Sequence, residues 1–180
     1  MELTRRGAIR LAGTAGLAAA AGLVLAAAPA SPAQAAQNGW RWCRQCQGLW
    51  FAGNPTLGVC PYRGTSGHSF VGSSNYSLPT AYPFDDGDQD GWFWCYRCEG
   101  LYYGLNGTNG ACPAGRAHSA DGSGVYSLYK DNPYVGGQVN WRWCRQCQGL
   151  WFAGNPTPGV CPASAAGHSL AGSGNYRLLD

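Results

Sequence analysis

Nine cysteines and three histidines recur at equivalent places in three segments of the chain. Each segment has a Cys-x-x-Cys pair, a third Cys after thirteen intervening residues, and a His after five to seven more. Thiolate sulfur and imidazole nitrogen are ligands that Zn²⁺ prefers, and three Cys with one His form a set that tetrahedral structural sites use. The three predicted ligand sets, which use every Cys and His of the chain, are Cys43, Cys46, Cys60 and His68; Cys95, Cys98, Cys112 and His118; and Cys144, Cys147, Cys161 and His168.

Disulfide bonds are the main alternative to metal binding, because many Cys in a secreted protein usually form a disulfide framework. Three Cys per segment and nine in total are odd numbers, so disulfides must leave a thiol unpaired or link different segments. The varying distance between the third Cys and the His suits a flexible Gly-rich loop that delivers a fourth metal ligand. We therefore expect three structural zinc ions, with a disulfide-rich secreted domain and another metal, such as iron, as alternatives.

The surroundings of each Cys-x-x-Cys pair resemble the zinc-ribbon and rubredoxin-type knuckle. In the first segment the resemblance is carried by the run from Trp42 to Trp50, with its two Cys, Gly48 and Leu49, and by the later Cys60-Pro61 pair. It implies that three Cys of each segment are ligands held in a hairpin. The chain departs from that family at the fourth ligand, where a His stands some residues further on instead of a nearby Cys, which favours zinc over iron.

Three internal repeats of about forty residues organise the chain. They span residues 39–78, 91–128 and 141–179, with an acidic linker at 79–90 and a second linker at 129–140. Chains of roughly 40 residues rarely fold without a metal, disulfides or a partner. We predict a small all-β fold of three metal-stapled, zinc-ribbon-like β repeats, arranged either as a compact pseudo-threefold, β-trefoil-like body or as beads on linkers. The strands expected in repeat one are Trp40–Cys43, Gly48–Ala52, a strand near Val59, and Asn75–Leu78.

All eight Trp residues of the chain lie in the repeats. One interpretation is that they build the core, because Leu, Ile and Val are scarce. The other is an exposed aromatic surface for sugar rings or a partner protein, since Trp supplies flat contact area at a low entropy cost. The candidate ligand-binding residues are Trp40, Trp50, Trp92, Tyr102, Trp141 and Trp151.

Residues 1–35 have the three parts of a secretory signal, namely a basic start, an apolar run and the small-residue site Ala33-Gln34-Ala35. The Arg5-Arg6 pair and its neighbours resemble the twin-arginine (Tat) export signal, although Ala8 stands where that family commonly has a bulky apolar residue. This resemblance implies export of an already folded protein, with metal loaded in the reducing cytoplasm.

The Ala-rich leader, followed by a Gly-rich and Trp-rich mature part, resembles actinobacterial secreted proteins. We expect cleavage after Ala35 and a secreted, extracellular or cell-wall-associated product that does not contact the membrane after cleavage. The formal net charge of +3 comes mainly from the leader, because residues from Ala36 onward include nine basic and eight acidic side chains. A nucleic-acid partner is therefore not expected, since such proteins carry a basic surface that replaces counterions on phosphate.

Catalysis is not expected from this sequence. Four protein ligands close a zinc site, whereas a catalytic zinc keeps an open position. A Ser follows each His, but a His bound to metal cannot act as a general base. We expect a non-catalytic binding module for a glycan, cell-wall or surface-protein partner, in which three copies supply avidity. A structural cell-envelope protein and an extracellular metal-storage protein are the alternatives.

The first linker ends in Asp86, Asp88 and Asp90, spaced like the opening of a calcium-binding loop. Arg97 stands where that loop requires a Glu, and no helices are expected on either side. The sequence favours a solvated acidic turn here and leaves a calcium site as the alternative.

Overall fold

The computed structural model describes residues 35–63, 66–80 and 88–180. The chain divides into two units, Met1–Pro32 and Ala33–Asp180. The first unit, with nearly all of the predicted secretory signal, lies outside the described residues, and so does Asp86. The second unit is built from strands, turns and loops, and no helix capable of crossing a membrane occurs in the described ranges.

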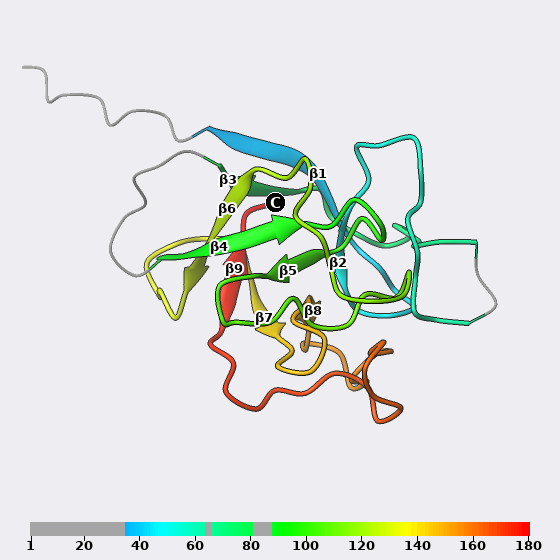
Figure 1. Cartoon of the computed structure of the whole chain (residues 1–180). Helices are drawn as coiled ribbons and strands as arrows, with labels where there is room; N and C mark the ends of the chain where they lie inside the picture. The colour runs from blue at the N-terminus through cyan, green and yellow to red at the C-terminus, as the bar shows by residue number, and fades with distance from the viewer. Residues whose placement is uncertain (1–34, 64–65, 81–87) are drawn as a thin grey trace, which may run out of the picture. The chain divides into compact units, whose positions relative to one another are not determined.

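Each repeat folds into three antiparallel strands, with the first strand in the middle (Figure 1). In repeat one, β1 (Ala36–Trp42) pairs with β2 (Leu49–Phe51) on one side and with β3 (Tyr76–Pro79) on the other. The other two repeats follow the same plan with β4 (Asp88–Trp94), β5 (Leu101–Tyr103) and β6 (Val125–Lys130), and with β7 (Gln138–Trp143), β8 (Leu150–Phe152) and β9 (Tyr176–Leu178).

The central strand of each repeat contains a β-bulge. In β1 the register with β3 shifts between Gln37 and Trp40, and Gly39 between them has a φ of 96°. Gly91 and Asn140 occupy the equivalent positions with φ of 84° and 70°. Positive φ is accessible to Gly and is more tolerable for Asn than for most other residues, so these residue types allow the bend at a bulge.

The three repeats join into a nearly closed, barrel-like sheet. Strands β6 and β9 pair directly, which makes one sheet of the order β5-β4-β6-β9-β7-β8, and repeat one adds the three-stranded sheet β2-β1-β3. Single bridges link the short strands in a ring, from Trp50 to Gly100, from Tyr102 to Gly149, and from Trp151 back to Gly48. Every repeat therefore contacts both of the others.

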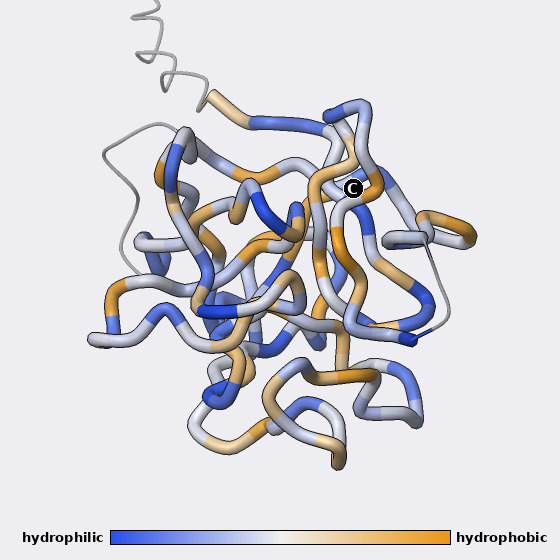
Figure 2. Tube along the Cα trace, turned by 45° about the vertical axis from the view of Figure 1, so that its right-hand side comes forward, coloured by the Kyte–Doolittle hydropathy of each residue, from blue (hydrophilic) through white to orange (hydrophobic). Residues whose placement is uncertain are grey.

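One hydrophobic core is shared by all three repeats. Each repeat contributes a Trp, a Tyr and two Leu. Short hydrophobic and hydrophilic stretches are interspersed along the trace (Figure 2). Each Trp packs edge-on against the Tyr of another repeat, with ring centroids 5.1–5.2 Å apart. The twelve core residues are Trp40, Leu49, Tyr76, Leu78, Trp92, Leu101, Tyr126, Leu128, Trp141, Leu150, Tyr176 and Leu178.

The all-β prediction is confirmed, whereas the bead arrangement is wrong because the repeats share one core. The more specific β-trefoil-like arrangement stays a prediction. The strand expected near Val59 is absent, since the Val59 N–H bonds the Cys98 carbonyl in repeat two at 3.3 Å instead of joining a ladder. Strands also extend into both predicted linkers. Asp88 and Asp90 lie in extended strand β4, so the favoured acidic turn is wrong for these two residues. The calcium alternative stays a prediction, because Asp86 lies outside the described residues.

Candidate metal centres

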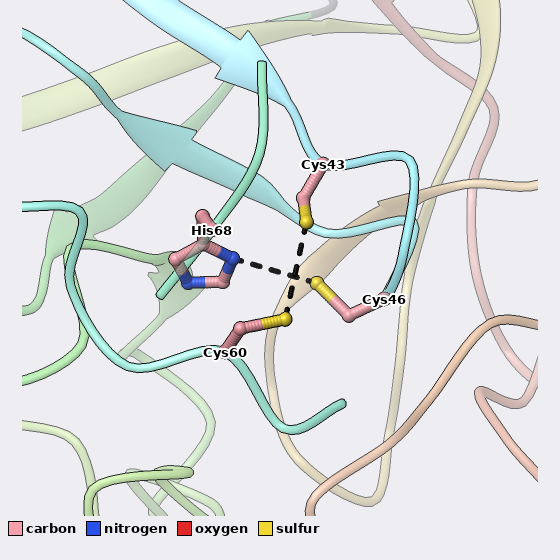
Figure 3. A group of neighbouring side chains, drawn as sticks. All are labelled: Cys43, Cys46, Cys60 and His68. Carbon is pink, nitrogen blue, oxygen red and sulfur yellow. Dashed lines mark hydrogen bonds between the residues drawn. The ribbon is translucent and has the colours of Figure 1, made fainter. Parts of the chain in front are cut away.

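The structure brings together the three ligand sets that the sequence predicts. Within each cluster the three sulfur atoms and one imidazole nitrogen lie within 4.8 Å of one another. The first and third Cys sulfurs are 3.9 Å apart in every repeat. The second Cys sulfur lies 3.5–3.6 Å from the His Nδ1, as Figure 3 shows for Cys46 and His68.

These separations fit a tetrahedral metal ion. With Zn–S of about 2.3 Å and Zn–N of about 2.0–2.1 Å, the edges of a tetrahedron are about 3.8 Å between sulfurs and about 3.5 Å between sulfur and nitrogen. A disulfide would instead require sulfurs about 2.05 Å apart. All nine Cys are free thiols in this structure, so it does not support the disulfide alternative. The three clusters could therefore hold metal ions.

A tight backbone turn places the two Cys of each Cys-x-x-Cys pair. In repeat one the Gln47 N–H donates to the Cys43 carbonyl at 2.8 Å, and the Cys43 N–H donates to the Gly48 carbonyl at 2.9 Å. Gln47 has a φ of 67°, and its counterparts Glu99 and Gln148 have 65° and 66°. The turn thus holds a non-Gly residue in a left-handed conformation, a strain that persists only where surrounding contacts fix it.

Hydrogen bonds within each cluster favour one thiolate. Contacts from Cys46 and Cys60 lower the pKa of Cys43 far below its ordinary range, with the Ser69 N–H adding a bond to its sulfur at 3.5 Å. The hydrogen bond to Cys43 raises the pKa of Cys60 to about 11, and the same contact, together with burial, raises the pKa of Cys46. A bound cation would stabilise all three as thiolates.

In repeat one the ligand His is fixed by a stacked ring and by a carbonyl. His68 stacks on Trp50 with centroids 5.2 Å apart, and its Nε2–H donates to the Cys98 carbonyl at 3.1 Å. A proton on Nε2 leaves Nδ1 as the lone-pair atom, and Nδ1 is the nitrogen that faces the sulfurs. Tyr102 and Trp151 stack in the same way on the His residues of repeats two and three.

The predicted aromatic binding surface is wrong. Its six residues, Trp40, Trp50, Trp92, Tyr102, Trp141 and Trp151, are at most 3 % exposed. Three of them, in the central strands, pack into the shared core, and the other three stack on the ligand His. Their large apolar rings are needed inside because the repeats contain few aliphatic side chains.

A ring of side-chain hydrogen bonds between repeats was not predicted from the sequence. Asn54 donates to Glu99 at 2.8 Å, and the amides Asn106 and Asn155 donate to Gln148 and Gln47 at 2.7 Å. Each acceptor directly follows a ligand Cys. An Asn stands at the same position in every repeat and could have indicated this role. In repeat one, however, Asn54-Pro55 is also a typical turn sequence, which explains the Asn without a contact between repeats.

The three clusters surround one small cavity of about 50 Å³. Each repeat lines it with the same five residue types, namely the second ligand Cys, the Gly and Leu after it, the Pro after the third Cys, and the ligand His. The clusters therefore border one common cavity and are not three isolated sites. No family model, curated protein or solved structure matched this chain.

Proposed function

We propose that this protein is a secreted, non-catalytic, zinc-stabilised repeat protein that acts as a binding module for a glycan, cell-wall or surface-protein partner. The observation that carries the proposal is the composition of the clusters. Four protein ligands at tetrahedral spacing leave no open coordination position for a substrate or an activated water. A bound metal then acts as a cross-link for a repeat too small to fold alone.

Zinc is the metal that best suits these ligands. Three thiolates and an imidazole are soft or borderline donors, whereas calcium and magnesium require oxygen ligands. A His ligand in every cluster, fixed through its Nε2–H in repeat one, favours zinc over the iron of an all-Cys rubredoxin-type site. Most of the ligands are buried, and the backbone carbonyls of Cys46 and Cys98 accept hydrogen bonds from a neighbouring repeat. Both features favour a permanent structural ion over metal storage.

A binding role is supported by the contrast between the constant clusters and a variable exterior. Exposed Phe70 and Val71, next to ligand His68, correspond to Ala120 and Asp121 in repeat two. Such side chains do not serve the shared core, so they are free to differ between repeats. A rigid scaffold with variable exterior positions suits recognition of a partner.

Adhesion to envelope material tests the binding role. The mature, metal-loaded protein is mixed with insoluble cell-wall polysaccharide, and the bound fraction is measured after sedimentation. We expect saturable retention that is lost when a chelator and heat have unfolded the protein. Retention at the level of an unrelated protein of similar charge would reject the binding role, and hydrolysis of the polysaccharide would reject its non-catalytic character.

A further inference from the structure

A hollow of about 200 Å³ lies between repeats one and three. Both repeats contribute to its walls, and no lining residue carries a charge. The lining residues are Trp42, Gly72, Ser74 and Tyr76 from repeat one, and Gln138, Phe152 and Asn155 from repeat three. It lies outside the metal clusters, and none of its residues is a metal ligand.

Two half-buried aromatic rings form the apolar part of this hollow. Trp42 and Phe152 meet edge-on, with ring centroids 6.5 Å apart and an interplanar angle of 76°. Gly72 borders the indole, and a Cβ built there would lie 4.0 Å from the Trp42 ring. The absence of a side chain at this position leaves the indole edge accessible. Because these two rings are only half-buried, they can contact a ligand, unlike the six buried aromatic residues that the sequence suggested as ligand-binding.

Two side-chain amides in the hollow are oriented by hydrogen bonds. In each amide these bonds engage only the oxygen or only the nitrogen. The Gln138 Oε1 accepts from the Tyr76 hydroxyl at 2.7 Å and from the Trp141 indole N–H at 3.0 Å. This assigns the Nε2 end as a remaining donor. The Asn155 Nδ2 donates to Gln47 at 2.7 Å, which assigns its Oδ1 as a remaining acceptor.

We propose that this hollow binds one ring of a neutral saccharide. A sugar ring presents C–H faces that pack on aromatic rings, and hydroxyls that both donate and accept hydrogen bonds, matching the Trp42 and Phe152 rings and the two oriented amides. The uncharged lining disfavours an anionic or cationic ligand. The volume is below the roughly 300–1,000 Å³ typical of drug-sized ligands, so it suits a single ring of a longer chain.

This inference rests on the proposed binding function and locates its site at one junction. The equivalent positions of Ser74 are Gly124 and Gly174, so the other junctions lack its hydroxyl. At Gly174 an added Cβ would lie 2.6 Å from the Lys130 side chain, which covers that junction. The junction of repeats one and three is therefore the one best suited to a ligand.

A matched pair of substitutions tests the site. Ser74 and Gly124 are both exposed, and each backbone carbonyl accepts from the preceding Ser hydroxyl at 2.6 Å. Ser74→Arg places a long charged side chain at the hollow, whereas Gly124→Arg adds the same charge where nothing lies within 4 Å. Binding of chitotriose and cellotriose, as neutral probes, is followed by Trp fluorescence and calorimetry on proteins with equal metal content.

We expect one of the probes to bind the wild type, Ser74→Arg to weaken it at least tenfold, and Gly124→Arg to change it less than twofold. Gln138→Glu provides a second variant, because it keeps the acceptor for Tyr76 and removes the N–H donor. It should weaken binding several-fold, while the counterpart Gln37→Glu should not.

Unchanged binding by Ser74→Arg and Gln138→Glu would overturn the site, and so would the absence of binding by the wild type to either probe. If the wild type still adheres to envelope material in that case, the proposed function stands and only the saccharide hollow is rejected. If adhesion is absent as well, both fail.

Discussion

Repeat two differs from repeats one and three in the side chains around its metal cluster, but not in the geometry of the cluster. Its ligand His stacks on Tyr102, where the other repeats use Trp50 and Trp151, and the interplanar angles are all 15–20°. Glu99 replaces a Gln and still accepts hydrogen bonds from an indole and an Asn. Cluster geometry therefore depends on an aromatic face and an oxygen acceptor, and not on particular residues.

Loss of a metal ligand in the diverged repeat should have the largest effect. Because all repeats share one core, we expect Cys98→Ser to unfold repeats one and three as well. Binding of a structural zinc ion contributes on the order of 10 kcal/mol to folding at neutral pH. This is comparable to the free energy of unfolding of a whole domain, which is about 5–15 kcal/mol. Circular dichroism melting and metal content measure this outcome.

Ser119→Ala is the control for this ligand variant, since the backbone N–H that bonds the Cys95 sulfur remains. A Cys98→Ser protein that keeps two metal ions and melts like the wild type would show that the repeats fold independently, against the shared core.

A close approach between repeats should give the next largest effect. Gly58 has a φ of 62°, and a Cβ there would lie 2.3 Å from the Cys98 carbonyl oxygen. We expect Gly58→Ala to lower the free energy of unfolding by at least about 3 kcal/mol in urea titrations. Gly107→Ala, with a φ of 82° but open space around it, should cost only about 1 kcal/mol. If the two variants lost the same free energy of unfolding, backbone strain and not the contact between repeats would be the cause.

Exchanging the stacked ring between repeats tests the equivalence of Trp and Tyr. Trp50→Tyr installs the residue of repeat two, and we expect a loss below about 1.5 kcal/mol with metal content unchanged. Trp50→Ala removes the face that supports His68 and should cost about 3–5 kcal/mol. If the Tyr variant lost metal as readily as the Ala variant, the indole itself would be required in repeat one.

The smallest effect is expected for the acceptor exchange. Glu99→Gln keeps an oxygen for the Trp94 indole N–H and for Asn54, and should change stability by less than about 1 kcal/mol. Glu99→Ala leaves both donors without this acceptor and should cost about 2 kcal/mol or more. Thermal melts of the two variants measure this difference. A Glu99→Gln variant that is destabilised as much as Glu99→Ala would contradict the prediction.

The sequence predicted the cluster ligands because their spacing is local and repeated three times. It also predicted the strands around Trp40 and Leu49, where aromatic residues lie between turn residues. The roles of the Trp residues could not be assigned, since an indole suits a core and a binding surface equally well. The ring of amides was missed because it joins residues such as Asn155 and Gln47, 108 positions apart, whose proximity depends on how the repeats assemble.

Metal content combined with thiol titration of the mature protein tests whether the three clusters are structural zinc sites. We expect about three zinc ions per chain, one for each Cys and His cluster, and nine thiols that react only after chelation and unfolding. A protein without metal, in which eight Cys are oxidised to disulfides and one thiol is free, would contradict it.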